Sequence, residues 1–327
     1  MKDKIRLYHL DLISAFFIVE IILMHILQFT NFYNTNTIFD KIYYILNFYM
    51  PWFYFKSGLF HKIRPFKEML KFNFRRLLVP FIVFTIFGMI IQFPFDVFIN
   101  GRVWWKFVLG SARDLFVNGA LYSNAPLWFL MSLFIIKLSY ALCDKMNSYI
   151  LVYILLTISV VLSYFEVVLP LTLSTLGIGI FFYHVGKNYF KIIDKTLITN
   201  NKNIVFYLLI FVFLCVFFHS TVDMRINKII TGNYIIWIIY SLLGISLFES
   251  IFRLIPRIQL IESIGTNSMT YYVVHWLVIY LIVMVINQFQ FKIESILIAG
   301  LLIIFNIIIL PTFNLLLTKN FKWLIGL

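Results

Sequence analysis

The sequence predicts an all-α membrane protein: a bundle of about ten transmembrane helices that forms one domain over residues 1–327, with both termini in the cytoplasm. Of the 327 residues, 62% are hydrophobic, 20% are aromatic and only 13% are charged, whereas a soluble domain is roughly half apolar and a quarter charged. The apolar residues are gathered into stretches that reach the ~20 residues needed to cross a hydrocarbon core of ~30 Å. Such a chain has too little polar surface to cover a water-soluble body.

Ten apolar stretches follow one another along the chain, and each is predicted to be a helix because an isolated strand cannot satisfy its backbone in lipid. They cover about residues 10–29, 40–60, 78–99, 125–142, 148–164, 168–186, 203–219, 233–251, 268–287 and 294–316. Asparagine, proline, glycine and charged residues separate them. The basic start is followed by a full-length span without a small-residue cleavage site, so no cleaved signal peptide is expected.

The distribution of lysine and arginine predicts the orientation. With a cytoplasmic N-terminus, eighteen of the 27 lie on cytoplasmic loops and seven on outer loops, while Lys56 and Lys137 fall within spans. Cytoplasmic loops carry such an excess, so both termini are placed inside. The same flanking residues account for the formal net charge of +13, and no nucleic-acid binding is expected. Cys143 and Cys215 lack metal-ligand spacing, so neither a disulfide nor a metal site is expected.

Ionisable residues inside the first span are the clearest functional signal. Residues 10–29 are apolar almost throughout, yet they contain Asp11, Glu20 and His25, and a charged group inside a membrane helix is costly and usually serves a pathway or chemistry. On a helix, His25 lies within roughly 40° of both Asp11 and Ser14, whereas Glu20 points about 140° away from His25. We therefore expect a polar passage from the cytoplasmic mouth up to His25. Taken alone, His25 also fits a core histidine bonded to a neighbouring backbone group.

Two loops also bear on function. The loop at 61–76 is basic, and on the predicted topology it faces CoA, nucleotides and lipid phosphates. The longest outer loop, at 100–125, is rich in aromatic residues and asparagine. Its Trp104 and Trp105 suit the face of a sugar, but they equally suit anchoring at the membrane interface. Both interpretations stay open.

Five further segments carry a family resemblance. They read YMPWFYFKSGLF at 49–60, FNFRRLLVPF at 72–81, APLWFLMSL at 125–133, LGIGIFFYHVG at 176–186 and IGTNSMTYYVVHWL at 264–277. In this order and at this spacing, they resemble the integral-membrane acyltransferase 3 family over residues 10–276. The resemblance implies a multi-pass protein of the bacterial cytoplasmic (inner) membrane. It also implies transfer of an acyl group, usually acetyl, from cytoplasmic acyl-CoA to a hydroxyl of a cell-surface or lipid-linked glycan.

One position departs from the family pattern. The family has an arginine or lysine, ten residues and then histidine in the first span, but Ser14 stands where the cation belongs. Lys56 lies in the second span at a similar depth. We hypothesise that Lys56 supplies the missing charge, or that it pairs with Glu20. The remaining alternative is that it extends to the inner membrane interface.

The resemblance assigns catalytic roles to His25, Asp11 and His275. His25 would act as a general base on the acceptor hydroxyl, or on a nucleophile in a two-step transfer, because imidazole titrates near pH 6.5. Asp11 would orient a basic partner. His275 matches the late histidine of the family, and it either lines the same passage or forms a hydrogen bond within the bundle.

Binding roles follow in the same way. Donor phosphates are expected to be held by the cations Arg75, Arg76, Lys71 and Lys56, since guanidinium forks suit phosphate, although ordinary cytoplasmic flanking explains Arg75 and Arg76 as well. The acceptor glycan is assigned to Trp104, Trp105 and Trp128. Acyl-CoA would be a co-substrate, with no bound cofactor and no metal, and membrane lipids would surround the bundle. Gly58 is expected to permit close helix approach.

Two other classes of function stay open. An intramembrane set of Glu, His and Lys also fits a transporter of a lipid-linked sugar or an anion. A non-catalytic partner of a polysaccharide synthase is the other alternative. The sequence does not determine the acceptor sugar, the modified hydroxyl, the acyl chain or the oligomeric state.

Overall fold

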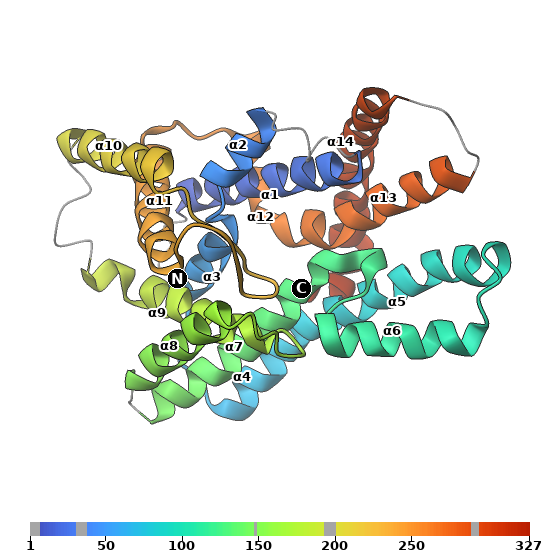
Figure 1. Ribbon diagram of the computed structural model, residues 1–327, viewed down its shortest axis with the longest axis horizontal. Helices are drawn as coiled ribbons and strands as arrows, with labels where there is room; N and C mark the ends of the chain where they lie inside the picture. The colour runs from blue at the N-terminus through green and yellow to red at the C-terminus, as the bar shows by residue number, and fades with distance from the viewer. Residues whose placement is uncertain (1–6, 31–37, 147–148, 193–200, 289–293) are drawn as a thin grey trace.

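The computed structural model describes residues 7–30, 38–146, 149–192, 201–288 and 294–327, which form a bundle of helices with one small β-hairpin (Figure 1). The first half of the chain contains α1 (Tyr8–Phe29), α2 (Ile38–Ile45), α3 (Tyr49–Leu59), α4 (Phe66–Asn73), η2 (Phe74–Leu78), α5 (Val79–Phe93), η3 (Pro94–Ile99), α6 (Trp104–Asn118), η4 (Tyr122–Leu127), α7 (Trp128–Lys145) and α8 (Ile150–Tyr164). The second half contains η5 (Leu173–Thr175), α9 (Leu176–Ile192), α10 (Asn201–Phe217), β1 (Thr221–Asp223), β2 (Lys228–Thr231), α11 (Tyr234–Leu254), α12 (Gln259–Thr266), α13 (Ser268–Gln288), α14 (Ser295–Asn320) and η6 (Lys322–Ile325). Apart from the antiparallel β1–β2 hairpin, the predicted all-α class is confirmed.

Six helical stretches of the described chain are long and apolar enough to cross a membrane. They are Tyr8–Phe29, Phe66–Ile99, Trp104–Lys145, Tyr234–Leu254, Ser268–Gln288 and Ser295–Asn320. Two shorter apolar helices cover Ile150–Tyr164 and Ile204–Phe217. The structure therefore supports a polytopic helical protein with about six such segments, where the sequence predicted ten. The cytoplasmic placement of both termini stays a prediction.

Two helices are shorter than the spans predicted for them, one because of a tertiary contact and one because of its backbone conformation. The span predicted at 40–60 divides into α2 and α3 at Asn47, which is buried. The side-chain carbonyl of Asn47 accepts hydrogen bonds from the backbone N–H of Val222 (3.1 Å) and from Nε1 of Trp237 (2.8 Å). The span predicted at 168–186 becomes helical only in α9, because Leu171 and Thr172 adopt positive φ angles of 51° and 61°, which a right-handed helix does not accommodate.

The sequence predicted a long outer loop at residues 100–125, and this prediction was wrong. Most of this segment forms α6, which ends at Gly119, where φ is 72°. α6 lies beside α5 at one end of the molecule (Figure 1), and the rings of Phe93 and Phe107 are 5.4 Å apart between them. The short amphipathic helices α4 and α12 and the β-hairpin were also not predicted.

Glycine contacts bring α3 and α9 together. A Cβ atom at Gly58 would clash with the carbonyl oxygen of Tyr183, and one at Gly186 would clash with the carbonyl oxygen of Phe55. The expectation that Gly58 permits close helix approach is therefore confirmed. α1 runs through the centre of the bundle against α11, α12 and α13 (Figure 1). These contacts fix the helices that carry the candidate site.

Candidate functional site

His25 and His275 lie together in the structure. The two rings, from α1 and α13, are nearly parallel, with centroids 5.5 Å apart, and the ring of Trp276 packs edge-on against His25 at 4.7 Å. His25 opens into a cavity of ≈340 Å³, which we call the histidine cavity, whereas His275 is fully buried behind it. The polar and aromatic residues that line the cavity include His25, Gln28, Tyr43, Asn47, Tyr49, Tyr122, Trp128, Asp223, Arg225, Tyr272 and Trp276.

Hydrogen bonds fix the direction in which His25 can act. Its Nδ1 lies 2.8 Å from Oε1 of Gln28, one turn along α1. Because an amide oxygen only accepts, Nδ1 carries the proton and Nε2 keeps its lone pair. His275 follows the same pattern, since its Nδ1 lies 3.1 Å from the carbonyl oxygen of Tyr271, and its Nε2 has no hydrogen-bond partner among the described residues. In both rings, Nε2 is therefore the nitrogen that keeps the lone pair.

The segment η4 holds α13 in position beside His25. Nε1 of Trp276 donates to the carbonyl oxygen of Tyr122 (2.8 Å), and the side-chain amide of Asn124 donates to the carbonyl oxygen of Val273 (3.1 Å). The hydroxyl of Tyr272 donates to another η4 carbonyl. These contacts explain why most of η4 is buried, although the sequence placed residues 100–125 in an outer loop.

The β1–β2 hairpin closes one side of the histidine cavity and contributes Asp223 and Arg225. It is held by side chains of other elements: Asn47 binds the backbone of the hairpin, and the hydroxyl of Thr175 donates to the carbonyl oxygen of Met224 (2.7 Å). The cavity thus combines aromatic surfaces with an amide, a carboxylate and a guanidinium group. Such a lining suits a molecule with many hydroxyl groups.

A second cavity, of ≈450 Å³, lies between α3, α4 and α7. It is lined by five cations, Lys56, Lys62, Arg64, Arg76 and Lys137, together with His61, and the described residues that line it include no aspartate or glutamate. We call it the basic cavity. Five cations that line one cavity favour a ligand with several negative charges.

The ammonium group of Lys56 lies beside Ser14, the position at which the family pattern has a cation. Its Nζ donates a hydrogen bond of 2.5 Å to Oγ of Ser14 and lies 3.5 Å from Oδ1 of Asp11. Ser14 in turn donates to the carbonyl oxygen of Leu10 (2.7 Å). The alternative pairing with Glu20 does not occur, because both carboxylate oxygens of Glu20 are buried without a hydrogen-bond partner in the described part of the chain.

The other predicted donor-binding residues divide into two groups. Arg76 lines the basic cavity, and its guanidinium lies over the ring of Phe72 together with that of Arg64, at 5.3 and 4.0 Å. Arg75 points away and donates to the carbonyl oxygen of Leu327 (2.9 Å). Lys71 is exposed and is not among the lining residues. Of the four predicted cations, the structure brings Arg76 and Lys56 to one cavity.

The tryptophans divide similarly. Trp128, at the start of α7, lines the histidine cavity and is 8% exposed. Trp104 and Trp105 lie at the start of α6, 62% and 46% exposed, and line neither cavity. Their position fits the interfacial alternative better than sugar contact.

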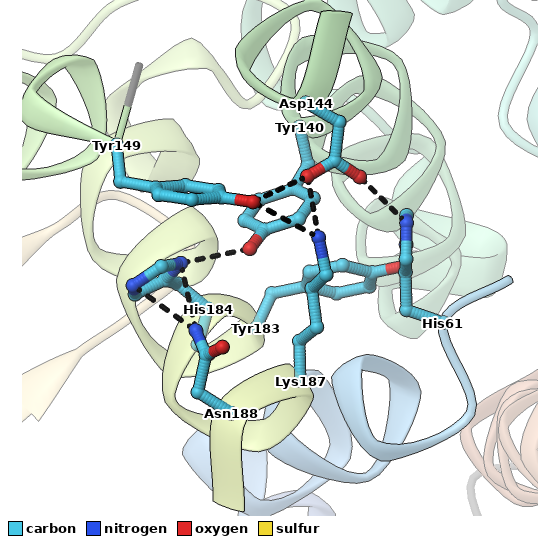
Figure 2. A network of polar contacts seen from close by, with 8 residues as sticks. All are labelled: His61, Tyr140, Asp144, Tyr149, Tyr183, His184, Lys187 and Asn188. Carbon is cyan, nitrogen blue, oxygen red and sulfur yellow. Dashed lines mark hydrogen bonds and ion pairs between the residues drawn. The ribbon is translucent and has the colours of Figure 1, made fainter. Parts of the chain in front are cut away.

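A polar network borders the basic cavity on the side of α9 (Figure 2). The carboxylate of Asp144 lies between Lys187, which forms an ion pair with it, and Nε2 of His61 at 2.8 Å. Nδ1 of His61 shares a hydrogen bond of 2.7 Å with the hydroxyl of Tyr183. Burial lowers the pKa of His61, and the neighbouring Asp144 carboxylate opposes that effect. The network thus holds His61 in place, and the loop with Lys62 and Arg64 begins directly after His61.

The network has a second arm that does not reach the cavity. The hydroxyl of Tyr140 lies 2.7 Å from Nδ1 of His184, and the side chain of Asn188 contacts the same ring (Figure 2). This arm joins α7 and α9. These contacts give His184 a structural role.

The passage expected between Arg76 and His25 is not continuous, and this corrects the sequence-based picture. Arg76 lies in the basic cavity and His25 in the histidine cavity, and aromatic rings of α3, α7 and α13 separate the two. The ring of Phe129, which lines the basic cavity, is 5.7 Å from the ring of Tyr272, which lines the histidine cavity. The two candidate sites are therefore close neighbours on opposite sides of one wall.

The comparison with known proteins decides the family. A family model described as an acyltransferase domain (acyltransferase 3) matches residues 7–314, nearly the whole chain. The chain belongs to the acyltransferase 3 family. With its apolar helices, this acyltransferase 3 protein is a multi-pass membrane protein. No curated protein and no solved structure matches the chain.

Several residues of this acyltransferase 3 site were not assigned from the sequence. Lys137 was noted as an intramembrane cation but was given no role, and Lys62 and Arg64 were part of the basic loop without being singled out. Asp223 and Arg225 had no signal, because the hairpin comes close to His25 only through tertiary packing. Within the described residues, no group of three or more His, Cys, Asp or Glu side chains is placed to hold a metal ion.

Proposed function

We propose that this protein transfers an acyl group, most simply acetyl, from cytoplasmic acyl-CoA to a hydroxyl of a cell-surface or lipid-linked glycan. It would do so in a bacterial cytoplasmic membrane, with both termini inside. The family supports the acyl-transfer class. The observation that carries the proposal is that His25, whose Nδ1 is held by Gln28, lines an aromatic and polar cavity next to a cavity lined by five cations.

The basic cavity suits the donor. CoA carries its phosphates at one end and a neutral thioester arm at the other. The cations Lys62, Arg64 and Arg76 come from the loop after α3 and from η2, and Phe53 and Phe129 add apolar surface to the same cavity. Charge-assisted hydrogen bonds would hold the phosphates, and the apolar surface would receive the acyl group. Lys56, beside Ser14 and Asp11, adds a cation within the cavity.

The histidine cavity suits the acceptor and its activation. Nε2 of His25 would take the proton of the acceptor hydroxyl as its oxygen attacks the thioester carbonyl. The new C–O bond forms, the C–S bond breaks, and the imidazolium returns the proton to the departing CoA thiolate. Gln28 keeps His25 in the required tautomer, while Trp128 and Trp276 supply flat apolar surfaces for a sugar ring.

Thiol release tests this proposal. Purified protein in nanodiscs is given acetyl-CoA, and free CoA is measured before and after addition of surface glycan from a deletion strain. Glycan-dependent release that is lost in His25→Ala supports the proposal. His219→Gln is the matched control, because His219 packs on Tyr44 and lines neither cavity. Release that does not depend on glycan, or that persists in His25→Ala, contradicts it.

One observation favours a second candidate. Two cavities separated by a closed wall are also typical of a transporter of a lipid-linked sugar or an anion in an occluded state. Such a protein would bind or move its substrate in vesicles without glycan-dependent release of CoA. The same assay therefore separates the two functions.

A further inference from the structure

Residues of α3 and α7 that are close together in the chain border both cavities. On α3, Met50 lines the histidine cavity and Phe53 lines the basic cavity, and three residues rise only about 4.5 Å along a helix. On α7, the two residues are consecutive: Trp128 faces the histidine cavity and Phe129 the basic cavity. A small displacement within this layer would therefore connect the two spaces.

Phe129 stands at the centre of the wall. Its ring centroid is 4.9 Å from that of Tyr54, 6.1 Å from that of Phe53 and 5.7 Å from that of Tyr272. The flanking tyrosines are tied down, because the hydroxyl of Tyr54 is 2.8 Å from Oγ of Ser132 and that of Tyr272 donates to an η4 carbonyl. Phe129 is held by packing alone. Its ring, like that of Phe53, can turn without breaking a hydrogen bond, and it contacts Tyr54 and Tyr272 as well as Phe53.

We propose that Phe129 selects the acyl group, by limiting what can pass from the basic cavity to the hydroxyl beside His25. This inference rests on the proposed function. A donor held by the cations of the basic cavity must bring its carbonyl carbon to the plane of Phe129 for an acceptor next to His25 to reach it. The acyl chain then lies in the space that Tyr54, Tyr272 and Phe129 leave. A short acyl group fits there, and a longer one collides with the Phe129 ring.

Exchanging the ring for a smaller side chain tests the inference. In Phe129→Ala, kcat/KM for hexanoyl-CoA relative to acetyl-CoA should rise at least about tenfold, since a few methylene groups in an apolar pocket change selectivity by that order. Phe129→Leu should shift the same ratio by less, and it serves if the alanine variant does not fold. Phe134→Ala is the matched control: Phe134 lies on the same helix, is partly buried in the core, and lines neither cavity.

The outcomes separate this inference from the proposed function. A ratio that rises in the Phe129 variants and stays constant in Phe134→Ala supports the inference. Wild-type transfer of acetyl with an unchanged ratio in folded Phe129→Ala and Phe129→Leu overturns it, while the proposed function stands. If the wild-type protein transfers no acyl group to any glycan, the proposed function falls and this inference with it.

Discussion

Removal of the Lys56 ammonium should weaken donor binding without unfolding the protein. Its Nζ donates to Ser14 at 2.5 Å and lies 3.5 Å from Asp11, at the edge of the basic cavity. A hydrogen bond to a charged group contributes roughly 1.5–3 kcal/mol, and each 1.4 kcal/mol is a factor of ten. Lys56→Met should therefore raise the KM for acyl-CoA about 10- to 150-fold. Thiol release at varied donor concentration measures this change.

A charge exchange makes the test specific. In Ser14→Lys combined with Lys56→Met, a cation returns to nearly the same place from α1, so the donor KM should recover most of the loss. Lys228→Gln is the control, because Lys228, which lies on the hairpin, pairs with Glu166 and lines neither cavity. An unchanged donor KM in folded Lys56→Met would refute the reasoning, as would a double variant that recovers nothing.

Three further predictions follow from the same structure. His25→Ala should reduce transfer by about 10²–10⁴-fold, with the affinity for acyl-CoA unchanged. His275→Gln should reduce transfer less. If equilibrium binding shows that His25→Ala loses donor affinity as strongly as it loses transfer, the loss argues against a general base. Burial lowers the pKa of His61 below its ordinary value of 6.5, so the unfolded chain takes up a proton that the folded protein resists. Stability should therefore be full above pH 6.5 and fall as the pH is lowered; thermal unfolding at pH 7.5 and 5.5 should show a smaller pH effect in His61→Gln, and an identical effect would contradict the assignment. Gly58→Ala should lower the unfolding midpoint, because its Cβ meets a backbone carbonyl of α9 and overpacking costs about 1–3 kcal/mol. Gly300→Ala, which meets no atom within 4 Å, should not lower it.

Much of the fold could be predicted because membrane helices carry a strong signal. The spans at 10–29, 233–251, 268–287 and 294–316 match α1, α11, α13 and α14 closely, since each is a long apolar run that no local contact interrupts. The prediction was wrong where tertiary contacts override hydropathy. Asn47 ends α2 because partners from the hairpin and α11 satisfy its side chain, and nothing near Asn47 in the sequence indicates those partners.

The sequence predicted those residues of the candidate site whose signal lies within one short segment. His25 and Asp11 were found because they are ionisable residues within one apolar span, and His275 and Arg76 through ordered motifs. Arg225 acquires its position only from the folded chain, since the hairpin that carries it is far from His25 in sequence. The separation of the two cavities likewise depends on how aromatic rings from three helices meet, which helical periodicity alone does not define.

The positions of Ser14 and Lys56 show that a sequence motif can miss a charge that a neighbouring helix supplies. On our hypothesis, the family pattern places a cation on the first helix because a cation is needed at one point in space beside Asp11. In this chain the point is occupied from α3, by a side chain whose Nζ is within hydrogen-bond distance of position 14. A lysine is long enough to span two packed helices, so the helix that supplies the charge can change while the charge itself stays. The absence of an arginine or lysine at position 14 is thus weak grounds for assuming lost activity, and the double exchange of Ser14 and Lys56 tests that argument directly.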